Sequence, residues 1–199
     1  MRTSCVDVGI ATRAMPGDSE QPCGDVGFFC RDGATVLVGL IDGLGHGPKA
    51  NDVAERARNA VTFRLSNEPL EKIFEQLTEL FRADRGFVAA ICRVNPQAET
   101  LEFSGIGNIT SRLFRDGETT LLSGSGIVGQ YSQRPKSKTI SFPQGSFLVL
   151  HTDGLSSHLH ARQLLEHRHE SADQAAHALL EQHARSTDDC GVVVIRCGQ

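Results

Sequence analysis

Two short apolar runs constrain the fold of this chain most strongly, and an aspartate follows each of them. Residues 35–41 are almost continuously apolar and lead directly into Asp42, while residues 147–150 are followed after two further residues by Asp153. Runs of this length are too short for a typical helix and are typical of strands that are buried on both faces. The sequence therefore predicts two covered strands, each of which presents an aspartate at its end.

A hairpin is predicted immediately before the first of these aspartates. The turn signal Asp32-Gly33 separates residues 26–31 from the apolar run, and Asp25 stands directly before the first of the two strands. Antiparallel pairing would place the start of one strand opposite the end of the other. We therefore expect Asp25 and Asp42 to lie close together.

The remaining periodic segments predict a chain of mixed α and β structure. Helical spacing of apolar residues covers residues 50–65 and 70–81, and Ser171 with Gln174 forms a capping box that predicts a last helix. Residues 87–144 show strand and turn patterns, which we interpret as one antiparallel meander. Strands are expected at residues 6–10, 26–31, 35–41, 88–94, 101–106, 111–115, 138–142, 147–150 and 192–195.

Composition excludes several classes of protein. The chain has 199 residues, 39% hydrophobic content and a net charge of −4, which fits one compact domain over residues 1–199 without a separate sensor domain. No basic stripe suits nucleic acid, no apolar run is long enough to span a bilayer, and no signal peptide opens the chain. Six cysteines without a C-x-x-C pair favour reduced thiols. We therefore expect a cytoplasmic location.

Aspartates at strand ends indicate metal chemistry. The predicted strands place Asp25, Asp42, Asp153 and the pair Asp188-Asp189 at strand ends or in adjacent loops. Carboxylates without nearby cysteines suit hard cations such as Mg²⁺ or Mn²⁺, and two such ions can activate a water and steady the oxygens of a phosphoryl group. A single Asp-Gly pair is more often an ordinary turn, so the prediction depends on the combination.

Five ordered motifs resemble those of the SpoIIE-type phosphatases, which belong to the metal-dependent protein phosphatase (PPM) superfamily together with protein phosphatase 2C. The resemblance covers about residues 25–195, and residues 42–47, Asp-Gly-Leu-Gly-His-Gly, are its most specific part. The motifs are Cys23-Gly24-Asp25, Ile41-Asp42-Gly43-Leu44-Gly45-His46-Gly47-Pro48-Lys49-Ala50, Gly105-Ile106-Gly107-Asn108, His151-Thr152-Asp153-Gly154 and Asp188-Asp189.

The resemblance implies a fold, a metal site and a mechanism. The implied fold is α+β, a four-layer α-β-β-α sandwich with two antiparallel sheets, like that of protein phosphatase 2C. Two Mn²⁺ or Mg²⁺ ions are implied, with Asp42 bridging them, the Gly43 carbonyl binding one, and Asp153 and Asp188 binding the other. Asp25 is implied to hold metal-bound water or to bind metal directly. These four aspartates would then act catalytically through metal-bound water.

The resemblance also implies a substrate and partners. A free-standing domain of this length is similar to family members that serve the stressosome, which implies a monomeric serine/threonine phosphatase acting on phosphorylated STAS-domain scaffold proteins of the RsbR and RsbS type. Its role would be negative feedback in bacterial stress signalling. Two alternatives stay open: a phosphatase of an anti-sigma-factor antagonist, which is also a STAS-domain protein, and a catalytically inactive binding module of the same fold.

Several local features have two interpretations each. Gly107-Asn108 could orient groups of the site or simply form a turn. Cys190 could make activity redox-sensitive or be a passive buried thiol, and it stands where many relatives have a methionine followed by threonine. His46 could donate a proton or be structural. The histidine-rich segment 151–169 could bind zinc or form a polar surface, and it contains His151, His158, His160, His167 and His169.

Overall fold

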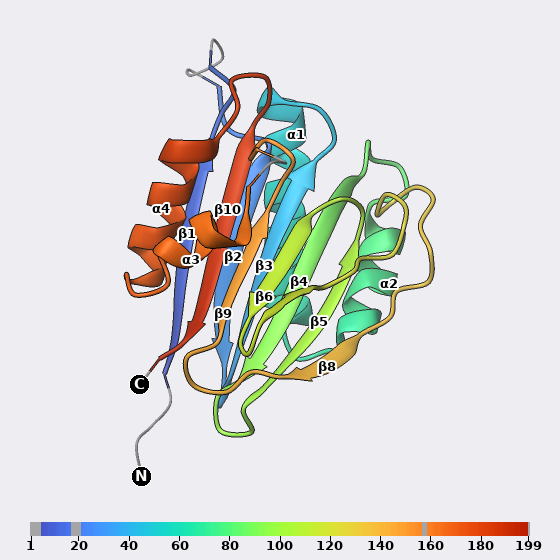
Figure 1. Ribbon diagram of the computed structural model, residues 1–199. Coiled ribbons are helices and arrows are strands. Elements are labelled where there is room, and N and C mark those ends of the chain that lie inside the picture. Colours follow the sequence, from blue (N-terminus) through green and yellow to red (C-terminus); the bar gives the residue numbers. More distant parts are fainter. Residues whose placement is uncertain (1–4, 17–20, 157–158, 199) are drawn as a thin grey trace.

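The computed structural model describes residues 5–16, 21–156 and 159–198. Two five-stranded antiparallel sheets pack face to face, and helices cover the outer face of each sheet (Figure 1). The first sheet has the order β2 (Asp25–Asp32), β3 (Thr35–Gly43), β4 (Phe87–Asn95), β5 (Thr100–Ile106) and β8 (Lys138–Ser141). The second has the order β1 (Val6–Arg13), β10 (Cys190–Cys197), β9 (Phe147–His151), β6 (Thr110–Phe114) and β7 (Glu118–Thr120).

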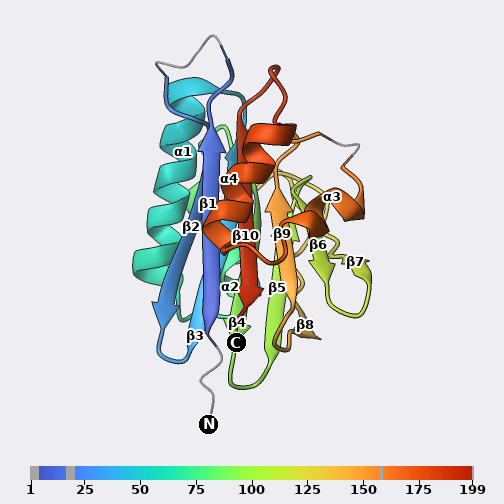
Figure 2. The ribbon, with the colours of Figure 1, turned by 60° about the vertical axis from the view of Figure 1, so that its left-hand side comes forward.

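Helices form the two outer layers. On the first sheet, α1 (Gly47–Ala60) continues without a break into a π-helix (Val61–Leu65), and α2 (Leu70–Leu80) follows. On the second sheet lie α3 (Ala161–Glu166) and α4 (Ala172–His183), which Figure 2 shows in front of β1, β10 and β9. The Ser171 side chain accepts a hydrogen bond from the Gln174 amide at 3.2 Å, so the predicted capping box is confirmed.

Three apolar clusters separate the four layers. One packs α1 and α2 on the first sheet, a second fills the space between the sheets, and a third packs α3 and α4 on the second sheet. Strand β3 contributes to two of them by simple alternation: Val36, Val38 and Leu40 face the second sheet, while Leu37 and Ile41 face the helices. Its almost continuous apolar sequence is therefore required, because both of its faces are covered.

The prediction of one meander over residues 87–144 is wrong. Strands β4, β5 and β8 join the first sheet, but the β6–β7 hairpin of this segment joins the second sheet, where β6 pairs with β9. Alternation of apolar residues shows that a strand has one face toward the core. Both sheets face the same core between them, so such a strand could be buried in either sheet. The pattern alone therefore could not assign β6 to its sheet.

The first and last strands are neighbours in the second sheet. Strand β1 pairs with β10 from Val6↔Cys197 to Arg13↔Cys190, and β10 pairs on its other edge with β9.

In the described part of the chain, none of the helices is both long and apolar enough to cross a membrane.

Candidate active site

Two aspartates face each other at one end of the first sheet. Asp25 begins β2, Asp42 lies near the end of β3, and the two residues are direct partners in the antiparallel register. The expected proximity of these two carboxylates is confirmed. Asp25 is only 4% exposed and Asp42 is partly buried, so both carboxylates are held out of bulk water.

The pKa values of Asp25, Asp42 and Asp188 are raised in the folded chain. Burial, and secondarily the charge of Asp42, raises the pKa of Asp25 well above its usual range. Burial and the charges of Asp153, Asp188 and Asp189 raise the pKa of Asp42 to about 7. The pKa of Asp188 is also raised, mainly by burial. The protein has thus concentrated negative charge where it is poorly solvated, and this favours either protons or cations there.

Thr152 supports Asp25 from the second sheet. Its hydroxyl donates a hydrogen bond to Asp25 Oδ2 at 2.7 Å and accepts one from the Gly191 amide at 2.9 Å. Thr152 follows β9 and is 1% exposed, so this bridge between the sheets is shielded from water. No role was predicted for Thr152 from the sequence, although it stands in the same motif as Asp153.

Asp153 and Asp188 lie in exposed loops beside the facing pair. Asp153 follows β9, and its Oδ2 accepts a hydrogen bond from Asn108 Nδ2 at 3.0 Å. Asn108 therefore orients a site residue besides forming the link between β5 and β6. Asp188 precedes β10, and its Oδ1 accepts a hydrogen bond from the Asp189 amide at 2.9 Å. Their contribution to the pKa of Asp42 places both carboxylates within electrostatic reach of it.

Asp189 has a different position from its neighbour. It is 4% exposed, and its two oxygens accept hydrogen bonds from the amides of Met15 at 2.8 Å and Gly24 at 2.6 Å. It thereby fastens both ends of the connection between β1 and β2 to the loop before β10. The sequence analysis missed this role, because the amides that Asp189 binds are more than 160 residues away in the chain.

Glycines follow two of the site aspartates because the backbone is crowded there. A Cβ at Gly43 would lie 2.3 Å from the Ala50 carbonyl oxygen in the first turn of α1, and a Cβ at Gly154 would lie 1.8 Å from the Asp189 carbonyl oxygen. Such distances exclude any side chain unless the backbone moves. The glycines therefore allow α1 and the loop before β10 to approach the aspartates closely.

The donor set fits a hydrated hard cation. A set of donors that consists mainly of carboxylate oxygens suits Mg²⁺ or Mn²⁺. Within the described ranges, no three histidine, cysteine, aspartate or glutamate side chains converge closely enough to hold an ion by themselves. Ions of this kind keep several waters and take few protein ligands. Asp25 and Asp42, with Asp153 and Asp188 beside them, could therefore hold such ions only together with water.

The histidines of segment 151–169 lie in separate places. His151 is buried, with Nδ1 2.9 Å from the Thr152 carbonyl oxygen, and His167 Nδ1 lies 3.1 Å from Glu170 Oε2. His160 is the N-cap residue of α3, and His158 lies outside the described residues. The described histidines do not gather into a zinc site, and among them His160 and His169 are exposed, whereas His151 and His167 are buried.

The neighbouring thiols are poor nucleophiles. Burial raises the pKa of both Cys23 and Cys190 to about 12, and the charge of Asp25 adds to the effect. The thiolate population at neutral pH is therefore very small, which favours passive thiols.

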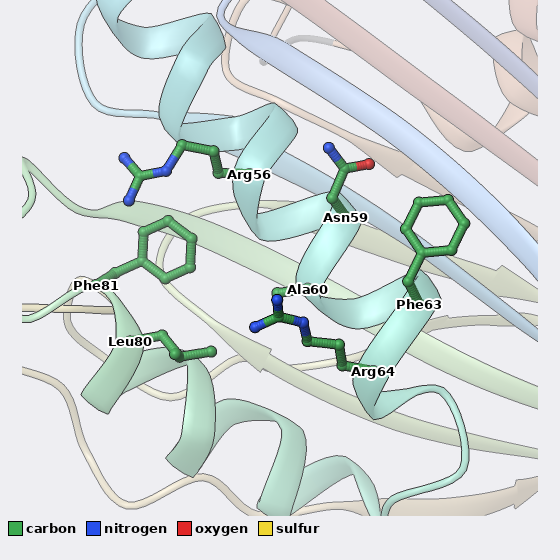
Figure 3. Close-up of a pocket in the computed structure, with 7 residues that line it drawn as sticks. All are labelled: Arg56, Asn59, Ala60, Phe63, Arg64, Leu80 and Phe81. Carbon is green, nitrogen blue, oxygen red and sulfur yellow. The ribbon is translucent and has the colours of Figure 1, made fainter.

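A cavity of about 420 Å³ lies away from the aspartates, on the outer helical layer. Figure 3 shows its lining residues on α1, the π-helix and α2, with Phe63 and Leu80 exposed at its edge.

A family model described as Stage II sporulation protein E (SpoIIE) matches residues 32–198, and the chain therefore belongs to the SpoIIE family. The chain is 30% identical over 156 residues to the phosphoserine phosphatase RsbX of Bacillus subtilis (strain 168), an alignment that covers 75% of this chain and 78% of RsbX. Both the predicted membership of this family and the predicted assignment to the serine/threonine phosphatases are confirmed.

Solved structures confirm the predicted fold. One chain, from work on "the bacterial stressosome: a modular system that has been adapted to control secondary messenger signaling", superposes with a TM-score of 0.88 and 31% identity, covering 96% of this chain and 100% of that one. RsbX in complex with magnesium superposes with a TM-score of 0.82 and 23% identity, covering 98% and 96%. The latter likeness shows the fold alone.

Proposed function

We propose that this chain is a metal-dependent protein serine/threonine phosphatase that dephosphorylates STAS-domain scaffold proteins of a stressosome, of the RsbR and RsbS type, as negative feedback in stress signalling. The observation that carries the metal-dependent part is the facing pair Asp25–Asp42, where poorly solvated carboxylates lie together and a cation would offset their charge. The likeness to RsbX and to a chain from stressosome work supports the substrate class.

Five residues would hold two Mn²⁺ or Mg²⁺ ions. In the proposal Asp42 would contribute to holding both ions, the Gly43 carbonyl one of them, and Asp153 and Asp188 the other. Asp25 would hold a metal or water on it. Two such ions lower the pKa of a shared water toward neutrality and offset charge on the phosphoryl oxygens.

Other residues of the chain position these ligands. Thr152 fixes the orientation of Asp25, and Asn108 fixes that of Asp153. Asp189 holds Gly24, in the connection before β2, in place. The Gly24 carbonyl in turn accepts a hydrogen bond from the Gly43 amide at 3.1 Å. The raised pKa of the nearby thiols argues against a cysteine phosphoenzyme, so water is the nucleophile in the proposed reaction.

The proposal treats residues 1–199 as one catalytic domain that acts as a monomer in the cytoplasm. Continuous pairing of β1 with β10 joins segments from opposite ends of the sequence into one sheet and supports a single folding unit. All six cysteines are free, which suits a reducing compartment.

The metal-dependent activity is tested with p-nitrophenyl phosphate. We expect phosphate release that requires added Mn²⁺ or Mg²⁺, falls to background in Asp42→Ala, and is retained in Asp116→Asn. Asp116 is a suitable control because it lies in the exposed turn of the β6–β7 hairpin. Full activity in Asp42→Ala, or activity independent of metal, would overturn the metal site. Absence of activity in the wild-type protein would favour the binding module.

The substrate class needs a separate experiment. The protein with Mn²⁺ is incubated in parallel with a phosphorylated scaffold protein and with a phosphorylated anti-sigma-factor antagonist, and the loss of phosphate is followed by mass spectrometry. The proposal expects faster loss from the scaffold protein. Faster loss from the antagonist would assign the alternative substrate while leaving the metal site intact.

A further inference from the structure

A polar cavity of about 530 Å³ lies on the second sheet, far from the aspartates. It is formed where the end of β10, the turn before β9 and the turn between α3 and α4 meet, and Arg168, His169 and Arg196 bring basic side chains to it. Arg196 is six residues along β10 from Cys190, which corresponds to roughly 20 Å at the rise of a strand. The cavity and the candidate active site therefore occupy opposite ends of the same strand.

The two arginines of this cavity lie outside the ion pairs that the described residues form. Elsewhere in the described chain seven arginines form ion pairs with aspartate or glutamate. Among the residues that the structure describes, neither Arg168 nor Arg196 has such a partner within 4.0 Å. Asp7 is opposite Arg196 in the β1–β10 register. Its Oδ2 accepts a hydrogen bond of 2.8 Å from the Ala172 amide at the start of α4.

Local hydrogen bonds orient the basic groups. Arg168 Nε donates to His169 Nε2 at 2.9 Å, so this edge of the guanidinium is fixed while its two terminal nitrogens keep their donors. The His169 ring accepts at Nε2 and therefore has its proton on Nδ1, which is a further donor. The cavity thus combines several donors with positive potential.

We propose that this cavity binds a compact, multiply charged anion of the diphosphate class. Guanidinium groups bind phosphate oxygens through paired N–H donors, and two guanidinium groups at one cavity suit two phosphates better than one. No phenylalanine, tyrosine or tryptophan is among the residues that line it. Recognition therefore rests on the phosphates, whether they belong to free pyrophosphate or to the diphosphate of a larger molecule. The proposal is independent of the proposed phosphatase activity.

The test uses EDTA-treated protein, in which no metal attracts phosphate to the aspartates. Pyrophosphate, inorganic phosphate and ATP are titrated separately by calorimetry, and backbone amide signals are followed by NMR. We expect one saturable pyrophosphate site per chain, affinity for pyrophosphate at least about tenfold above that for phosphate, and shifts of the Gly145 and Gly198 signals but not of Gly43. Arg168→Gln should weaken binding about tenfold or more, by loss of a charge-assisted hydrogen bond.

Matched variants separate this site from the rest of the molecule. Arg168 is exposed in a turn, so Arg168→Gln tests the site without threatening β10, and Arg196→Gln is a second variant. Arg64→Gln, in the exposed π-helix, and Asp42→Asn should both bind pyrophosphate as the wild-type protein does. Failure to saturate, equal loss in Arg64→Gln, or signal shifts centred on Gly43 would overturn the proposal. ATP binding as tight as pyrophosphate would identify the diphosphate of a larger molecule as a ligand; phosphate binding as tight as pyrophosphate would refute the diphosphate class.

Discussion

At the scale of single residues, two side chains next to the predicted ligands hold the site together by hydrogen bonds. Thr152 links Asp25 to the Gly191 amide, and Asp189 links the Met15 and Gly24 amides to the loop before β10. Both are almost completely buried, so water cannot replace the bonds they make. Their roles are open to test by substitutions that keep shape and change one bond at a time.

Thr152→Val should impair the site more than its small change in shape suggests. The substitution leaves the Gly191 amide without its acceptor and removes a donor to Asp25, which costs about 1.5–3 kcal/mol for a bond to a charged group. We expect phosphatase activity to fall by roughly one to two orders of magnitude on that basis. Thr152→Ser retains the hydroxyl and should stay close to wild type. Equal activity of the two variants would contradict the role assigned to this hydroxyl.

We expect substitutions of the adjacent residues Asp188 and Asp189 to have different effects, on activity for Asp188 and on stability for Asp189. With Mn²⁺ present, Asp188→Asn should reduce phosphatase activity strongly while changing the free energy of unfolding little, because Asp188 is exposed. Asp189→Asn leaves one buried amide without a carboxylate acceptor and should lower the free energy of unfolding by about 1–3 kcal/mol. Urea denaturation and p-nitrophenyl phosphate assays on both variants check this. An Asp189→Asn protein as stable as wild type would refute the assignment.

The sequence predicted which two aspartates face each other, but it did not predict the residues that support them. The predicted hairpin placed Asp25 opposite Asp42, and the register confirms this proximity. The inclusion of Asp153 and Asp188 depended on the family resemblance. The buried roles of Thr152 and Asp189 depend on contacts between segments more than 120 residues apart. Local patterns contain no information about such contacts.

At the scale of elements, helix starts and hairpins followed from local chemistry, whereas the choice of partner strand did not. The capping box before α4 and the turn Asp116-Gly117 between β6 and β7 involve residues within a few positions of each other. The assignment of β6 to the second sheet depends on β9, more than 30 residues away. Long-range pairing is decided by the whole core, which explains why the predicted meander was wrong.

The cap of α4 gives a prediction at this scale. Ser171→Ala removes the side-chain acceptor for the Gln174 amide, and loss of such a cap costs about 1 kcal/mol. For a chain of this length we expect a melting temperature lower by about 2–4 °C. Ser171→Thr retains the acceptor and should lose less. Calorimetry of both variants measures the difference, and an unchanged melting temperature in Ser171→Ala would show that the cap is energetically silent.

At the scale of the whole molecule, the facing aspartates should make the stability of the metal-free protein fall as pH rises. The pKa of Asp42 is about 7 in the folded chain, against roughly 3.9 for an unfolded aspartate. Between these values the folded state binds more protons than the unfolded state, so the free energy of unfolding decreases with pH, by at most about 1.4 kcal/mol per unit for this group.

Urea denaturation in EDTA from pH 5 to pH 8 measures this slope. Asp42→Asn should flatten it and should be more stable than wild type at pH 8, since the amide removes one of the opposed charges. Addition of Mn²⁺ should raise the stability of the wild-type protein but have less effect on the variant. A metal-free wild-type protein that becomes more stable between pH 5 and pH 7 would contradict the raised pKa.

The position of β10 between β1 and β9 also governs how the protein can be made. A chain growing on the ribosome synthesises β1 first, but β1 has no partner in its sheet until residues 190–197 have been translated and have left the exit tunnel. The β2–β3 hairpin can place Asp25 and Asp42 together early, whereas Thr152 and Asp188 can join them only at the end. Completion of the second sheet, and with it the gathering of all four aspartates, therefore depends on β10, which is the last of the strands to be translated.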